Sequence, residues 1–119
     1  MVKVTLVIQQ PEINRFLKDE LRLALDDGAS VIDIIKAADE HIIKRLGRFP
    51  VKGYKSLLHM TYHPIEERFY RQTAVHAYTR PGAFLNVREN PKMPLPDDVK
   101  IIIVPEGGCM SDEEEVVNL

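Results

Sequence analysis

One short run near the end of the chain constrains the fold more than any other stretch. Residues 99–104 read Val-Lys-Ile-Ile-Ile-Val, and β-branched side chains favour the extended, pleated backbone. Pro105 follows at once and ends the hydrogen-bond ladder, because proline has no N–H to donate. We therefore predict a buried central strand, with few of its residues facing water.

Beyond Pro105 the chain passes through Gly107 and Gly108. Neither residue has a Cβ atom, so the backbone there is bare and can be extended. A bare thread carried by a rigid strand could place a backbone carbonyl in the narrow active site of another protein. An ordinary flexible join before a tail explains the same residues, because paired glycines are common in loops.

Composition bounds the class of protein. With 119 residues, 45% hydrophobic and 29% charged, the chain suits one compact domain with a real core. No run is long enough to span a membrane and the N-terminus lacks a signal-peptide pattern, so we expect a cytoplasmic protein without a membrane partner. The single cysteine, Cys109, excludes an internal disulfide and a cysteine-only metal site.

Charge separates the body of the chain from its end. Residues 109–119 hold four acids, Asp112 to Glu115, and no base, so their removal would change the net charge from −2 to +2. This pattern predicts a solvated, disordered acidic tail behind a domain of residues 1–108. The nearly neutral body offers no dense basic face, so no nucleic-acid partner is expected.

Alternation predicts the first strands. Apolar and other residues alternate over residues 2–8, and Pro11 ends that strand. A second alternating run covers residues 21–25 and stops at an Asp-Asp-Gly turn. The residues between them, 12–20, fit either a short helical turn or the start of the second strand.

The helix has the most complete pattern in the chain. Ser30 is a good N-cap, and Asp33 stands where a capping box places its acid. Apolar residues at helical spacing form one stripe from Val31 to Leu46, and Gly47 is a typical C-terminal stop. We predict one helix over about residues 31–46, packed on a sheet.

The second half predicts further strands. Residues 57–62 and 69–78 are rich in aromatic and β-branched residues, and the segment 63–68 between them indicates a hairpin. Residues 84–88 give another short strand. The first and last strands are buried most simply side by side and parallel, beneath the helix. The expected fold is an α+β roll: a mixed sheet of four or five strands grasping one main helix.

Three segments also match a known pattern in order and spacing. Residues 27–35 (DGASVIDII) are similar to an Asp-Gly-x-Thr-Val-x-x-Leu helix entry, and residues 84–88 (FLNVR) to a short strand with a Val-Asn-Gly signature. Residues 95–108 are similar to a Leu-x-Asp-Gly-Asp-x-Val…Pro…Gly-Gly ending. Together they resemble the ubiquitin-like β-grasp superfamily, especially the sulfur carriers of molybdopterin and thiamine biosynthesis and the ubiquitin-like modifiers. The resemblance covers about residues 1–47 and 84–108; residues 48–83 are longer than in the compact carriers.

The resemblance implies a carrier or modifier rather than an enzyme, without a cofactor of its own. Its reactive group would be the carboxylate of Gly108, energised by an adenylating enzyme like those that activate ubiquitin. Because eleven residues follow Gly108, it also implies cleavage before Cys109 by a protease, such as a zinc metalloprotease of the JAB/JAMM type.

An apolar patch on the exposed face of the sheet would dock the partner. We assign Val7, Ile102 and Val104 to this patch, together with Pro105 at the end of the last strand. A β-grasp interaction module without C-terminal chemistry is the alternative function, since the fold alone does not fix a function.

Histidines and the cysteine offer weaker alternatives. His59 and His63 would share one helical face, but as strand residues they would lie roughly 13 Å apart, too far for one ion. His41 and His76 complete the set without a metal-site spacing. Acidic neighbours disfavour the thiolate of Cys109, so it is expected to be simply the first residue removed.

Arg68, Arg71 and Arg80 stand near aromatic residues. They predict either a small basic patch for an acidic partner or scattered surface cations, and we favour the second interpretation.

Overall fold

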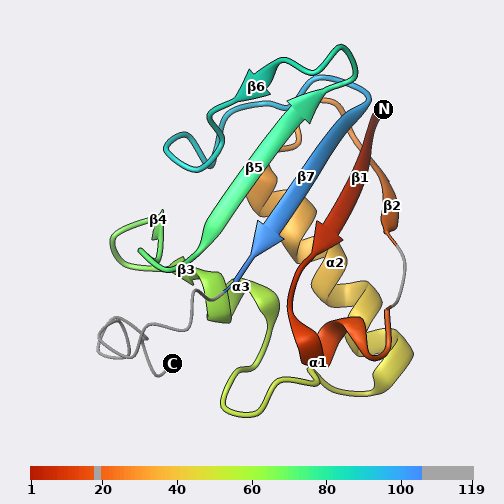
Figure 1. Cartoon of the computed structure of the whole chain (residues 1–119), viewed down its shortest axis with the longest axis vertical. Coiled ribbons are helices and arrows are strands. Elements are labelled where there is room, and N and C mark those ends of the chain that lie inside the picture. Colours follow the sequence, from red (N-terminus) through yellow and green to blue (C-terminus); the bar gives the residue numbers. More distant parts are fainter. Residues whose placement is uncertain (18–19, 106–119) are drawn as a thin grey trace.

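Five strands form one sheet, and a long helix lies across one of its faces (Figure 1). The computed structural model describes residues 1–17 and 20–105. The strand order is β2-β1-β7-β5-β6, with β1 Val2–Ile8, β2 Leu21–Leu25, β5 Ala74–Thr79, β6 Phe84–Leu85 and β7 Val99–Val104. The helices are α1 Pro11–Asn14, α2 Val31–Leu46 and α3 Leu57–Thr61, and β3 Tyr62–His63 pairs with β4 Arg68–Phe69 in a small separate ribbon.

The first and last strands lie together near the centre of the sheet, as predicted. β1 and β7 run parallel, with Leu6 beside Ile101 and Ile8 beside Ile103, and β5 runs antiparallel along the other side of β7. Figure 1 shows the three strands in front of α2. The predicted α+β roll is therefore confirmed, and its arrangement is compatible with a β-grasp.

Only one face of β7 is buried, so the prediction that few of its residues face water is only partly correct. Val99, Ile101 and Ile103 are buried beneath α2, whereas Lys100 is exposed and Ile102 and Val104 are partly exposed. The reason is the period of two along a strand: a helix on one side of the sheet covers alternate residues.

The predicted helix is confirmed at both ends. The backbone N–H of Ser30 donates to the Asp33 carboxylate at 2.9 Å. Gly47 ends α2 in the left-handed conformation, with φ 79°, and its N–H donates to the Ile43 carbonyl at 2.7 Å. The apolar stripe is buried against the sheet and consists of Val31, Ile34, Ile35, Ala38 and Ile42.

The turn before β7 is tied to the start of the chain. The Leu95 N–H donates to the Ala29 carbonyl at 2.9 Å, beside the start of α2. The Lys3 N–H donates to the Asp97 carboxylate at 2.7 Å, which aligns β7 with β1. The hydrogen bond from the Lys3 N–H is the largest cause of a lowered pKa at the Asp97 carboxyl.

The strand predicted over residues 57–62 is wrong, because residues 57–61 form α3. The Asp39 carboxylate on α2 accepts hydrogen bonds from the Leu57 N–H at 2.6 Å and the Leu58 N–H at 3.1 Å. Ser56 caps the same helix by accepting from the His59 N–H at 3.0 Å. These acceptors satisfy the N–H groups at the start of α3, and this stabilisation outweighs the local preference of residues 57–61 for a strand.

Other boundaries also differ from expectation. The predicted strand over 69–78 divides into β4 and β5, and the strand over 84–88 shortens to β6. Within the ambiguous segment, residues 12–14 belong to α1, which Gln10 caps by accepting from the Ile13 N–H at 2.8 Å.

Candidate functional site

The candidate site lies where β7 ends, because the diglycine follows that end. Pro105 is buried, and its carbonyl accepts a hydrogen bond from the Thr73 hydroxyl at 2.9 Å. Next to it, the Ile103 carbonyl accepts from the Gln9 N–H at 2.8 Å. Thr73 is itself only 1% exposed, so the last described residue is held from the interior of the molecule.

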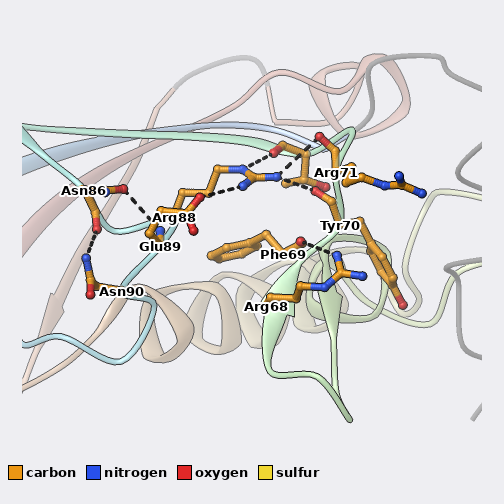
Figure 2. Close-up of polar contacts among 9 residues, drawn as sticks. Arg68, Phe69, Tyr70, Arg71, Asn86, Arg88, Glu89 and Asn90 are labelled. Carbon is orange, nitrogen blue, oxygen red and sulfur yellow. Dashed lines mark hydrogen bonds and ion pairs between the residues drawn. The ribbon is translucent and has the colours of Figure 1, made fainter.

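Arg88 holds the loop that carries Thr73 (Figure 2). Its Nε donates to the Thr73 carbonyl at 2.9 Å, and its Nη2 donates to the Tyr70 carbonyl at 3.0 Å and to the Arg71 carbonyl at 3.4 Å. Glu89 pairs with Nη1 at 3.1 Å. A rigid planar fork of donors suits a set of converging carbonyls, so Arg88 fixes the position from which Thr73 binds Pro105.

Arg88 lies in a turn, residues 86–90, that two asparagine side chains stabilise. Asn86 accepts from the Glu89 N–H at 3.3 Å through its Oδ1, and its carbonyl accepts from Asn90 Nδ2 at 2.9 Å (Figure 2). Residues 86–90 therefore form a turn, whereas the predicted strand extends from residue 84 to residue 88.

Three of the predicted docking residues share the partly exposed face of the sheet. Val7 on β1 lies beside Ile102 on β7, and His76 on β5 lies on the other side of Ile102. Val104 pairs with Ala74 one step closer to the end of β7. Pro105 differs from these three residues, since it is buried and held through its carbonyl.

The same face continues toward the other end of β5 with two aromatic side chains. The rings of Tyr78 and Phe84 meet edge to face at 5.9 Å between centroids, and Phe84 is 57% exposed. Neither ring belongs to the predicted patch, although the alternation around Tyr78 could have indicated its outward position.

Gly107, Gly108 and Cys109 lie outside the described residues. Their predicted roles therefore remain predictions, as do the domain limit at residue 108 and the acidic tail.

The histidines do not converge. The Nδ1 of His59 accepts from the Lys55 N–H, and the Nδ1 of His63 accepts from the Ile65 and Glu66 N–H groups. The distance argument for this pair used a strand and was wrong, because His59 lies in α3. Across residues 1–17 and 20–105, no three His, Cys, Asp or Glu residues gather in a way that could hold a metal ion.

The arginines lie at separate places. Arg68 pairs with Glu66 at 2.7 Å, and Arg80 pairs with Asp98 at 3.3 Å at the opposite end of β5. Arg71 lies in the loop held by Arg88. They fit scattered surface cations better than one patch.

Comparison with protein-family models, curated proteins and solved structures finds no match. Among the described residues, no helix is both long and apolar enough to cross a membrane. The geometry at the end of β7 and the sequence beyond it are therefore the features that bear on function.

Proposed function

We propose that this chain is a ubiquitin-like protein modifier or sulfur carrier, activated at its diglycine after removal of residues 109–119. One observation carries the proposal: β7 is the central strand beside β1, and its end at Pro105 is anchored by Thr73 just before Gly107 and Gly108. A firmly held strand end followed by a side-chain-free thread is what a partner needs to receive a chain terminus.

The chemistry proposed for the terminus has three steps, all performed by partners. A protease hydrolyses the peptide bond after Gly108 and leaves a free carboxylate. An adenylating enzyme joins that carboxylate to AMP from ATP and releases pyrophosphate, since a carboxylate alone is a poor electrophile. A sulfide donor or a cysteine thiolate then displaces AMP to give a thiocarboxylate or a thioester. A Cβ atom at Gly107 or Gly108 would obstruct the narrow passage to the nucleotide.

Reach sets a further condition on the partner. Three residues, 106–108, extend from the anchored Pro105, and three residues span about 10 Å at most. The adenylating enzyme must therefore approach the end of β7 closely. Val104 and the neighbouring Ile102 and Val7 are partly exposed along that approach, which supports their assignment to the docking surface.

Intact-mass analysis of the protein purified from its native host tests the proposal. We expect a species that ends at Gly108, as a carboxylate or, with one oxygen replaced by sulfur, a thiocarboxylate. A Gly108→Ala variant expressed in the same host is the matched control and should not acquire sulfur or form conjugates. A population that wholly retains residues 109–119 contradicts the proposal.

A second function, an interaction module without terminal chemistry, is favoured by the exposed Tyr78–Phe84 pair on the same face as Ile102. A partner whose affinity falls with Ile102→Glu and is unchanged by Gly108→Ala would support this alternative. A partner lost in both variants would favour the carrier.

A further inference from the structure

A hollow of about 500 Å³ lies on the helix side of the molecule, where α2, α3 and the β3–β4 ribbon meet. Its walls are mainly apolar and include Ile32, Leu58 and the ring of Tyr62. A volume of this order accommodates several side chains of a peptide or a small organic molecule. The hollow is separate from the end of β7 and from the exposed face of the sheet.

One polar group in the wall lacks a partner. Tyr62 is 9% exposed, and its hydroxyl makes no hydrogen bond within the described parts of the chain. Burial, with a smaller contribution from Glu67, raises the pKa of Tyr62, so the hydroxyl stays protonated as a donor. A buried donor without an acceptor costs free energy, and an occupant of the hollow that reached this hydroxyl with an acceptor would recover it.

The rim is cationic. Lys36, Lys55 and Lys92 line the opening together with one acid, Glu67, which pairs with Lys92 at 2.5 Å. An occupant with apolar side chains and several carboxylates would match both the walls and the rim.

The chain itself contains such a segment. Residues 112–119 read Asp-Glu-Glu-Glu-Val-Val-Asn-Leu, four acids followed by a segment in which three of four residues are apolar. Fourteen residues follow Pro105 and can span up to about 46 Å, more than the longest dimension of the molecule, 36 Å.

Hydrogen bonds connect the end of β7 to the hollow. The Thr73 hydroxyl binds the Pro105 carbonyl, and the Thr73 N–H donates to the Tyr70 carbonyl at 3.0 Å. The Tyr70 N–H then donates to the Thr61 carbonyl at 2.9 Å, one residue before Tyr62. Three hydrogen bonds therefore link Pro105 to Thr61, the residue before Tyr62 in the wall of the hollow.

We propose that in the uncut chain residues 112–119 occupy this hollow. The acids lie against Lys36, Lys55 and Lys92, where they compete with Glu67, and the apolar residues cover the wall. Single exposed ion pairs contribute about 1 kcal/mol or less. A tethered segment nevertheless has an effective concentration in the millimolar range, so weak affinity is enough. Removal of residues 109–119 then uncovers a cation-rimmed surface that the precursor hides.

The test uses the full chain with a nitroxide near its end. Cys109→Ser combined with Asn118→Cys gives one attachment site, and ¹⁵N spectra report which backbone amides the label broadens. We expect broadening at Ile32, Lys36 and Leu58. The double variant Lys36→Glu, Lys55→Glu should remove most of this broadening, because the tail then faces like charge. Adding Glu113→Lys and Glu115→Lys to that variant should restore the broadening, because the charges are opposite again. Lys52→Glu, an exposed lysine outside the hollow, is the matched control and should leave it unchanged.

Two further arms complete the test. Tyr62→Phe should weaken the broadening without loss of stability, since it removes only the unpartnered hydroxyl. Broadening that survives in the Lys36→Glu, Lys55→Glu variant would overturn the proposal. In a second sample, unlabelled ¹⁵N chains are mixed with separate chains that carry the nitroxide. If the broadening arises only between chains in this way, the occupant is a second copy, and the proposal is also overturned. These measurements on the full chain involve no protease and no activating enzyme, so their outcome is independent of the proposed function.

Discussion

The central layers and the connecting segments of this molecule share one apolar core, but the connecting segments depend in addition on single polar side chains. In β1, β7 and α2, ladder hydrogen bonds and a shared apolar core stabilise the structure. In residues 48–73 and 86–94, single polar side chains such as Asp39 and Arg88 reach across long sequence separations to fix short turns. Losing one core contact should weaken the whole fold, whereas losing one polar anchor should open one segment.

This difference matters for the candidate site, because the two kinds of structure meet there. β7 belongs to the central layers, yet the carbonyl of Pro105, the residue after it, is held by Thr73 from a connecting segment. The position of the Pro105 carbonyl thus depends on an anchor that can loosen without unfolding the sheet.

Ile101→Ala should produce the largest effect. Ile101 is fully buried in β7 between β1 and β5, and truncating such a side chain costs about 4 kcal/mol through lost burial and a residual cavity. We expect one cooperative urea transition, shifted to lower denaturant. Ile102→Ala, one residue along and partly exposed, should lose much less. Equal losses would mean that packing under α2 does not dominate the stability.

Asp39→Ala should come next, with a loss of about 3 kcal/mol because two backbone N–H groups lose their acceptor. Hydrogen exchange should accelerate first at Leu57 and Leu58 in α3, while the amides of β1 and β7 change only with global stability. Glu40→Ala, an exposed neighbour on α2, provides the control. Uniform acceleration throughout the sheet would contradict a locally acting anchor.

Asp39 should also give stability a specific dependence on pH. Burial raises the pKa of its carboxyl from 3.8 to about 6, against the lowering effect of the two hydrogen bonds from α3. The folded state therefore holds a proton that the unfolded state releases, so the free energy of unfolding falls as pH rises from about 4 to about 6. Urea midpoints across that range should show the slope in the wild type and in Glu40→Gln. This pH dependence should be absent in Asp39→Asn. If it persists in that variant, another titrating group causes it.

The same contrast explains how much the sequence could predict. β7 and α2 were predictable because the β-branched run that Pro105 ends, the Ser30 cap and the Gly47 stop are local signals. The helix α3 was missed because its deciding partner, Asp39, is 18 residues away from Leu57, although Ser56 before a Leu-Leu-His-Met run was an available N-cap signal.

At the candidate site, the exposed positions of Val7 and Ile102 follow from the period of two along a strand. The anchor formed by Thr73 and Arg88 could not be predicted in this way, because no local sequence pattern links residue 73 to residue 105. Side chains that act across the fold carry little signal in their own neighbourhood.

Thr73→Val should have the smallest effect on stability and the most specific one at the site. The change keeps the shape of the side chain but removes the hydroxyl that donates to Pro105, at a cost of about 1 kcal/mol. We expect faster hydrogen exchange near the end of β7, at Val104, with the amides of β1 and α2 unchanged after correction for global stability. Thr5→Val, on the exposed face of β1, is the matched control. If Val104 exchanges at the wild-type rate in Thr73→Val, the ladder alone holds the end of β7, and the connecting segment has no part in fixing it.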